Sequence, residues 1–280
     1  MNQSSVWLIT GCSSGFGREI SNIVIDIGCK LIVTSRNIDN LSAIINKNND
    51  NIICAALDVT DPGQIDDVVR MAEERFGGVD VLVNNAGYGY LSAVEEGEEA
   101  EVRAMFETNV FGLFAMTRAV LPGMRRRRRG HIVNFSSIGG LIGFPGVGFY
   151  NATKFAVEGF SEALAKEMRP LGVRVTIVEP GPFRTDWAGR SLKVTKAAIA
   201  DYAATAGARR EMIRDYSGRQ PGDPVRAAKA IVAAVEAADP PLHLLLGRPA
   251  FDAATHKLGE LSREYEAWRE ISLGADFPAA

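Results

Sequence analysis

Short apolar runs alternate along the chain with longer segments in which apolar residues recur at the helical period. The runs are rich in Val, Ile and Leu and lack a polar face, which is typical of strands buried on both sides in a parallel sheet. They lie at 6–10, 30–35, 52–57, 79–84, 131–136, 173–178 and 242–246. The helical segments lie at 15–28, 38–47, 62–76, 98–128, 150–169 and 224–238. This alternation predicts right-handed strand–helix–strand crossovers and a doubly wound parallel α/β sheet with helices on both faces.

Two segments fall outside the alternation. The segment 182–223 separates the sixth strand from the next helix, and a connection of that length predicts a lid or binding loop. The segment 249–272 is a charged helical pattern that contains KLGELSREYEAWRE. We expect residues 1–280 to form one domain that carries both additions.

The composition is that of an ordinary soluble globular protein, 46% hydrophobic and 23% charged with a net charge of -3. That balance favours neither nucleic acid nor a membrane surface as a partner. The start, MNQSSVWLITG, lacks a basic region followed by a long apolar core, so we expect no signal peptide. We also expect no membrane-spanning segment, because no apolar run approaches roughly 18 residues.

The cysteines and histidines predict a reduced, cytoplasmic location and no metal site. The three cysteines are an odd number without metal-ligand spacing, and the three histidines are scattered, with no second ligand type beside any of them. These residues are Cys12, Cys29, Cys54, His131, His243 and His256.

The run RRRRR (125–129) fits either a polyanion-binding patch or the exposed last turn of the 98–128 helix, with Gly130 as the stop. We favour the second interpretation, because no aromatic or further basic residue extends the patch.

The composition changes near residue 60. Residues 1–60 hold eleven isoleucines, eight asparagines and only three alanines, whereas residues 61–280 hold thirty-three alanines. We therefore hypothesise a chimeric chain with a junction near residue 60.

A glycine-rich turn, TGCSSGFG (10–17), joins the first strand to the first helix. Its glycines allow a tight turn and a close approach of the backbone to a pyrophosphate, which the helix N-terminus would attract. At this place in an alternating α/β chain the turn predicts dinucleotide binding. The residues concerned are Gly11, Ser13, Ser14, Gly15, Phe16 and Gly17.

The end of the second strand indicates which dinucleotide is bound. An acidic residue there would bind the ribose hydroxyls and repel a 2′-phosphate. This chain instead has Ser35 followed by Arg36, a small hydroxyl and a guanidinium that can pair with a phosphate. We predict NADP(H) in preference to NAD(H).

The stretch YNATK (150–154) places a tyrosine and a lysine on one face of a helix. Alone, this spacing fits either an acid–base couple or two residues of an amphipathic surface. Transfer of a hydride to a ketone leaves an alkoxide that needs a proton from a nearby acid. Moving a tyrosine pKa from about 10 to about 7 requires roughly 4 kcal/mol, which one cation about 4 Å away supplies at an effective dielectric near 20.

Taken together, these motifs resemble the classical short-chain dehydrogenases/reductases, over about residues 5–250. The resemblance rests on TGCSSGFG (10–17), DV (58–59), NNAG (84–87), Asn109 in ETNVFG, SS (136–137), YNATK (150–154) and PGPFRT (180–185). Through LITGCSSGFG, NNAGYG and KFAVEGFSEALAKE the chain is most similar to the 17β-hydroxysteroid dehydrogenase-like group. The family resemblance implies a single Rossmann-type dinucleotide-binding and catalytic domain with strand order 3-2-1-4-5-6-7.

The resemblance also implies the catalytic roles. Tyr150 would be the general acid/base, and Lys154 would lower its pKa and anchor the ribose. Ser137 would polarise the carbonyl, with Ser136 as the fallback, and Asn109 would hold a water in the proton relay.

It further implies that Asp58 and Val59 meet the adenine and that the NNAG residues line the adenine and ribose. The segment after the sixth strand would hold the nicotinamide carboxamide. The residues concerned are Asn85, Ala86, Gly87, Pro180, Gly181, Phe183 and Thr185.

Apolar and aromatic residues follow strands 4, 5 and 6, so we expect a small hydrophobic ketone, aldehyde or alcohol as substrate. Two alternatives remain open: reduction of a carrier-bound β-ketoacyl group, and cofactor binding without useful turnover. Pairing of the 98–128 and 150–169 helices, common in the family, implies a homodimer or homotetramer. The expected substrate contacts are Tyr88, Leu141, Phe144, Phe149 and Trp187, about half of which we expect to be packing residues.

Overall fold

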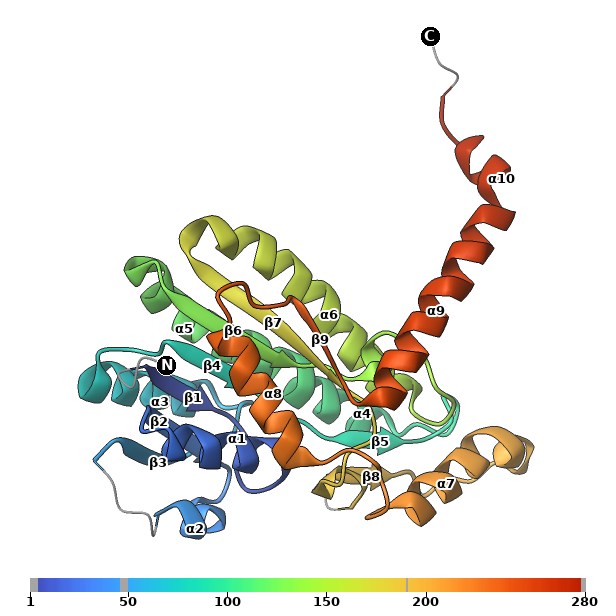
Figure 1. The fold of residues 1–280 in the computed structure, drawn as a ribbon. Helices are drawn as coiled ribbons and strands as arrows, with labels where there is room; N and C mark the ends of the chain where they lie inside the picture. Colours follow the sequence, from blue (N-terminus) through green and yellow to red (C-terminus); the bar gives the residue numbers. More distant parts are fainter. Residues whose placement is uncertain (1–4, 46–49, 190, 278–280) are drawn as a thin grey trace.

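The computed structural model describes residues 5–45, 50–189 and 191–277. Seven parallel strands form the main sheet in the order β3-β2-β1-β4-β6-β7-β9, which confirms the predicted fold and order (Figure 1). A separate parallel pair, β5 with β8, was not predicted. The strands of the main sheet are β1 (Val6–Ile9), β2 (Lys30–Ser35), β3 (Ile52–Ala56), β4 (Val81–Asn84), β6 (Gly130–Phe135), β7 (Val173–Pro180) and β9 (His243–Leu246), and those of the pair are β5 (Gly89–Leu91) and β8 (Leu192–Val194).

The helices are α1 (Gly15–Asp26), α2 (Ser42–Ile45), α3 (Pro62–Phe76), α4 (Glu99–Phe106), α5 (Leu113–Arg127), α6 (Gly148–Met168), α7 (Ala208–Tyr216), α8 (Pro224–Glu236), α9 (Arg248–Ala267) and α10 (Arg269–Leu273). The predicted helix 38–47 is a 3₁₀ turn followed by α2, and its positions 46 and 47 lie outside the described residues. In the part of the chain that the structure describes, no helix is long and apolar enough to cross a membrane.

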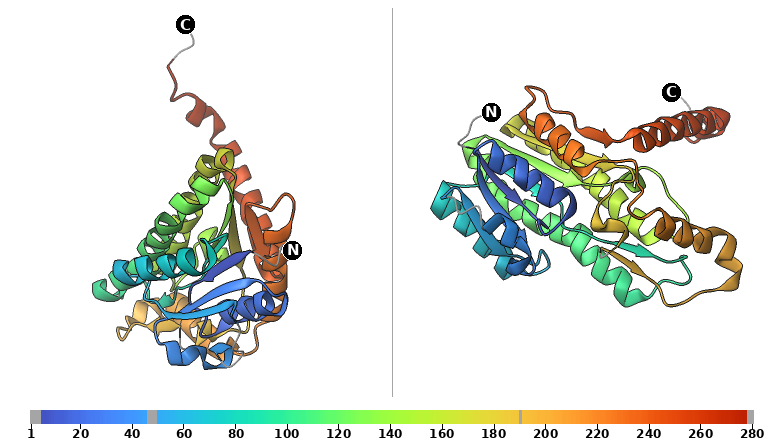
Figure 2. Two further views of the ribbon diagram at one scale, coloured as in Figure 1. Left: turned by 90° about the vertical axis from the view of Figure 1, so that its left-hand side faces the viewer. Right: turned by 60° about the horizontal axis from the view of Figure 1, so that its bottom comes forward.

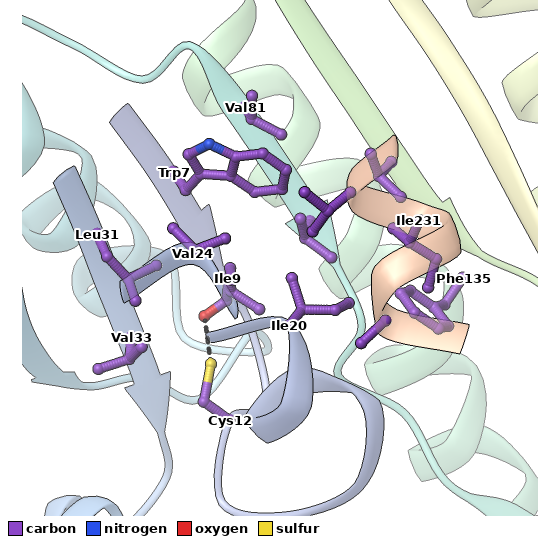
Figure 3. Packing of buried hydrophobic residues seen from close by; sticks show 14 of the residues in the cluster. Trp7, Ile9, Cys12, Ile20, Val24, Leu31, Val33, Val81, Phe135 and Ile231 are labelled. Atoms are coloured by element: carbon purple, nitrogen blue, oxygen red, sulfur yellow. Dashed lines mark hydrogen bonds between the residues drawn. The ribbon is translucent and has the colours of Figure 1, made fainter. Parts of the chain in front are cut away.

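Two apolar clusters hold helices against the two faces of the sheet (Figure 2). On one face α1 and α8 contribute Ile20, Val24 and Ile231, which pack on Trp7 and other strand residues (Figure 3). On the other face α3, α5 and α6 pack on the same strands. Both clusters combine residues from before and after residue 60, so the two compositional parts share one core; the chimeric origin stays a hypothesis.

The arginine run ends a helix, but not at the expected residue. Helix α5 stops at Arg128, which adopts a left-handed φ of 49°, and Gly130 instead begins β6. The guanidinium of Arg129 pairs with Asp80 at 2.9 Å, and that of Arg127 donates to a main-chain carbonyl at 2.6 Å. These two arginines therefore connect the C-terminal end of α5 to Val79 and Asp80, just before β4 begins.

The predicted helix 98–128 is interrupted. Between α4 and α5 the chain forms a π-helical segment, Glu107–Gly112, which contains Asn109. Such π segments are rare and often occur at functional sites.

The segment 182–223 carries β8 and α7, and β8 pairs with β5 beyond the carboxyl end of β4. The expected lid is therefore attached through the main chain of β5, on the side of the sheet where the site lies. The terminal helices α9 and α10 project away from the sheet (Figure 1).

Candidate active site

The glycine-rich turn lies between β1 and α1 and folds back on itself. Gly11 and Gly15 adopt φ values of 72° and 57°, which side chains disfavour. A Cβ on Gly17 would lie 2.4 Å from the Gly11 carbonyl oxygen, so only glycine fits there. The Asn85 amide donates to the carbonyls of Thr10 at 2.8 Å and Gly11 at 3.0 Å, which ties NNAG to the turn.

The N-terminus of α1 differs from those of α3 and α8 in its capping. Asp61 and Asp223 cap those two helices by accepting main-chain N–H groups. At α1 the N-cap residue is Ser14, and its side chain makes no capping hydrogen bond. The N–H groups of this first turn, the positive end of the helix dipole and the glycine cradle together fit the pyrophosphate of a dinucleotide.

The segment after β7 runs beside the same turn. Thr185 would lie 3.4 Å from a Cβ on Gly15, and the Phe183 ring lies 5.2 Å from the Phe16 ring. Pro180 ends β7, and Gly181 packs closely against the main chain of Ala250. The glycine-rich turn, which contains Ser13, was expected to hold the pyrophosphate, and the segment after β7 was expected to hold the nicotinamide carboxamide. The structure thus brings these two segments together.

At the adenosine side, Ser35 ends β2 and is buried, whereas Arg36 is exposed. The Asp58 carboxylate accepts from the Thr60 main chain at 3.0 Å and hydroxyl at 2.7 Å, so it holds its own turn. Val59 is buried and packs against the π-helical segment at Gly112. This edge therefore offers an exposed guanidinium, and one oxygen of the Asp58 carboxylate is bound by its own turn.

Tyr150 and Lys154 lie one turn apart in α6, and both are buried. The Lys154 ammonium donates to the Phe135 carbonyl at 2.8 Å and lies 5.7 Å from the Tyr150 ring centre. Ser137, not Ser136, is close enough to the Tyr150 hydroxyl to lower its pKa, as is Trp187, whose ring lies 5.4 Å from the Tyr150 ring. The structure thus brings the predicted tyrosine, lysine and serine to one place at the ends of β6 and β4.

Asn109 joins this group from the π-helical segment. Its side-chain oxygen accepts from the Tyr88 main chain at 3.0 Å, and its amide donates to the Tyr88 carbonyl at 2.8 Å. A Cβ on Gly87 would lie 3.0 Å from the Asn109 oxygen and 3.8 Å from the Lys154 ammonium. Asn109 therefore fixes the chain after Ala86 and Gly87 against the lysine.

The electrostatics differ from the expectation that Lys154 lowers the tyrosine pKa. Burial raises the pKa of Tyr150 to about 12, against the smaller opposing effect of the Ser137 and Trp187 side chains. Burial also lowers the pKa of Lys154 to about 8, although the nearby Glu158 carboxylate acts in the other direction. The cost of burying the phenolate therefore outweighs the effect of the ammonium 5.7 Å from the ring centre in the protein alone.

Aromatic side chains surround Tyr150. The Trp187 ring lies 5.4 Å from the Tyr150 ring, and both belong to a cluster that includes Tyr88, Phe144 and Phe149. Phe149 also lines a hollow of about 480 Å³ beside α4, so part of its surface faces away from Tyr150. Leu141 is half-buried in the loop after the 3₁₀ turn Ile138–Gly140 and is not a member of this cluster.

Three titratable side chains near Lys154 form a cluster that the sequence did not predict. Glu158, one turn after Lys154, and Glu179, just before Pro180, are buried, and the exposed His243 closes their cluster. The His243 Nδ1 atom lies 2.7 Å from Glu179 and 3.8 Å from Glu158, so the expectation that no histidine has a ligand-type neighbour was wrong. The available signal was that Glu158 shares a helix face with Lys154 at a spacing of four residues.

Burial raises the pKa of both carboxyls, that of Glu158 to about 7. Two carboxyl groups whose ligand-type atoms lie within 4.8 Å of each other and of His243 cannot both ionise cheaply, and a shared proton relieves the repulsion. Ser136, adjacent to Ser137, faces this pair. The raised pKa of Glu158 therefore keeps a proton in this cluster below about pH 7, one helical turn from Lys154.

We expect Glu158→Gln to flatten the pH dependence of stability. The folded pKa of Glu158 lies above its ordinary 4.5, so the folded state keeps a proton between pH 4.5 and about 7 that the unfolded state releases. Stability is therefore present at low pH and is lost as pH rises through 7, by up to roughly 3 kcal/mol. Urea unfolding at pH 5 and pH 8, with EDTA present, should show a smaller loss in the variant. Glu167→Gln, an exposed position of the same helix, is the control, and equal losses in both variants would contradict the shared proton.

Comparisons with known proteins agree with this geometry. A sequence model of the family described as short chain dehydrogenase matches residues 5–195. Oxidoreductase BOA17 of Botryotinia fuckeliana is 39% identical over 273 residues, which are 97% of this chain and 99% of that protein. The 3-ketodihydrosphingosine reductase of Bacteroides thetaiotaomicron is 38% identical over 246 residues, 88% of each chain.

Solved structures give the same picture. A short-chain dehydrogenase from Streptomyces avermitilis is 42% identical and superposes with a TM-score of 0.92 over 99% of this chain and 100% of that one. The closed form of serine dehydrogenase complexed with NADP+ is 29% identical, with a TM-score of 0.74 over 86% and 94% of the two chains. The first similarity runs through residue 60 and through α9.

Proposed function

The chain belongs to the short-chain dehydrogenase family, and on that premise we propose that this oxidoreductase interconverts a hydrophobic ketone or aldehyde and its alcohol, with NADP(H) as cofactor and Tyr150 as general acid/base. The observation that carries the proposal is buried Tyr150 with the buried Lys154 ammonium 5.7 Å from its ring centre, on the side of the sheet where Asn85 holds the glycine-rich turn.

The chain's own residues support reduction. When bound, the cofactor supplies the hydride. Ser137 orients the carbonyl, and Tyr150, whose raised pKa keeps it protonated at neutral pH, donates its proton to the oxygen as negative charge develops there. The positive charge of Lys154 then stabilises the phenolate that remains. Asn109 keeps the chain that carries Gly87 in place beside that ammonium.

The preference for NADP(H) rests on Ser35 and Arg36. The exposed Arg36 guanidinium is free to pair with a 2′-phosphate, and the small Ser35 leaves room for it. Arg36 also acts electrostatically on Tyr88 and on Lys193 of β8, which places a second cation near this edge. The complex of the related serine dehydrogenase with NADP+ is consistent with this assignment.

We expect Arg36→Ala to weaken NADPH binding about 10- to 100-fold, the usual worth of a hydrogen bond to a charged group, while NADH binding changes little. Fluorescence titration of the protein with both reduced cofactors measures this ratio. Arg75→Ala removes an exposed arginine from α3 and should leave it unchanged. Equal binding of NADH and NADPH by the parent would refute the assignment.

The aromatic cluster around Tyr150 favours a hydrophobic substrate. The related 3-ketodihydrosphingosine reductase, whose name denotes a long-chain ketone, agrees with this class. The test follows NADPH consumption with a panel of hydrophobic ketones and aldehydes. Turnover of carrier thioesters alone would favour β-ketoacyl reduction, and NADPH binding without turnover would favour a regulatory role. The arginine run does not support β-ketoacyl reduction as the alternative function. Its residues bind groups at the start of a strand, away from Tyr150.

We also propose a homo-oligomer in the cytoplasm. Phe111 of the π-helical segment and Phe155 of α6 are about half exposed, at 53% and 48%, on the helices expected to pair. Burial of these rings against a second copy would remove them from water.

A further inference from the structure

Helix α9 leaves the body of the molecule soon after it begins (Figures 1 and 2). Ala250 and Ala254 in its first turns are buried against the body, and the later turns have mostly exposed side chains. A projecting helical stretch of about 14 residues is only marginally stable by itself in water, and helices normally gain stability by packing an apolar face. Between 255 and 268 every described side chain is exposed or only partly buried.

The exposed part nevertheless carries an apolar seam with the spacing of a coiled coil. Large exposed side chains occur at Phe251, Leu258, Tyr265 and Trp268, which are 60% to 69% exposed. With Ala254 and Leu261 they recur at alternating intervals of three and four residues, the a and d positions of a heptad repeat. We call the six residues 251, 254, 258, 261, 265 and 268 the α9 seam.

The charges beside the seam argue against a lipid surface as its cover. Between 248 and 277 there are six acidic and four basic residues, so the helix is weakly acidic, whereas helices that bind anionic membranes carry basic polar faces. The residues are Asp252, Glu260, Glu264, Glu266, Glu270 and Asp276, against Arg248, Lys257, Arg263 and Arg269.

The seam is complementary to itself when two copies run antiparallel. Leu258 then meets Leu261 of the second copy, and Tyr265 of that copy lies over the turn that carries Ala254, whose own side chain stays buried against the body. Phe251 meets Trp268, beside a hollow of about 550 Å³ that Trp268 and residues near it line. At the flanking g positions Lys257 of each copy faces Glu264 of the other, which gives two attractive pairs.

We propose that α9 is an interaction surface whose partner is α9 of a second copy of this chain, packed antiparallel along the seam. The two bodies then lie at opposite ends of the helix pair. This contact is separate from the one proposed for Phe111 and Phe155, so the two together would build a tetramer from dimers. It does not depend on the proposed catalytic activity.

The first test compares Leu258→Glu/Tyr265→Glu with His256→Glu/Arg263→Glu. Each pair adds two carboxylates at exposed positions, in the seam and on the opposite helix face respectively, so neither change burdens the folded monomer. Light scattering after size exclusion should show the mass of the seam variant reduced to half that of the parent. The opposite-face variant should keep the parent mass, and both should bind NADPH alike. An unchanged mass in the seam variant, or a monomeric parent, would overturn the proposal.

A charge exchange tests the antiparallel direction. Lys257→Glu and Glu264→Lys alone should each weaken the contact several-fold, and the double variant should restore it. In a parallel pair Glu264 would instead face Arg269, so loss without rescue would refute the antiparallel arrangement. Binding of the parent to vesicles of anionic phospholipid that Leu258→Glu/Tyr265→Glu abolishes would assign the seam to a membrane and also overturn the proposal.

Discussion

Replacing Tyr150 by Phe should lower the rate of ketone reduction about 10²- to 10⁴-fold, the usual contribution of a positioned general acid. The phenol is the group that can protonate the substrate oxygen beside Ser137, and its raised pKa means that it carries this proton throughout the neutral range. The ring itself, which packs against Trp187, remains. We therefore expect a loss in kcat with the affinity for NADPH retained, measured by stopped-flow reduction and by fluorescence titration.

Tyr90→Phe provides a matched control. Tyr90 belongs to the same aromatic cluster and is more deeply buried, and its hydroxyl accepts from the Glu98 main chain at 3.1 Å. Loss of that bond should cost about 1 kcal/mol of stability and leave the rate within a few-fold of the parent. If Tyr90→Phe and Tyr150→Phe reduced the rate alike, the hydroxyl of Tyr150 would have no special part in proton transfer.

The strand order was predictable because each strand is a continuous apolar run and parallel strands impose a limited set of crossovers. The pair of β5 and β8 was not, because three-residue strands carry no periodicity of their own and form only when the chain after β7 returns to β4. The break in the 98–128 helix was invisible for a similar reason. Asn109 forms hydrogen bonds to a distant main chain, and a local pattern does not contain that contact.

For the site as well, the sequence predicted features that a local motif contains and missed those that depend on distant contacts. Gly17 could be placed from the motif, since a cradle for a pyrophosphate requires glycine, whereas the motif did not show that Asn85 holds the turn through its carbonyls. The proton-sharing cluster could not, because Glu158, Glu179 and His243 come from three elements that meet only in the folded sheet. The rise in the Tyr150 pKa was also missed, since charge spacing along a helix says nothing about desolvation.

Lys154→Met should lower kcat/KM for NADPH about 100-fold at pH 7 and remove a pH dependence that the parent shows. A charge about 6 Å from the phenol contributes roughly 3 kcal/mol at an effective dielectric near 20, which corresponds to that factor. In the parent, kcat/KM should fall above about pH 8 with the loss of one proton, because the buried Lys154 ammonium becomes neutral there.

The variant has no ammonium to lose, so its lower kcat/KM should stay level between pH 7 and 9. Lys166→Met removes an exposed cation from the same helix and should reproduce the parent profile. A parent profile that stays flat through pH 8 to 9 would mean that the charge of Lys154 is not needed. If the fall in kcat/KM above pH 8 persisted in Lys154→Met, a group other than Lys154 would cause it. The decline in the parent and its absence in the variant together would show that the ammonium, and not only the shape of the lysine, supports the proton transfer by Tyr150.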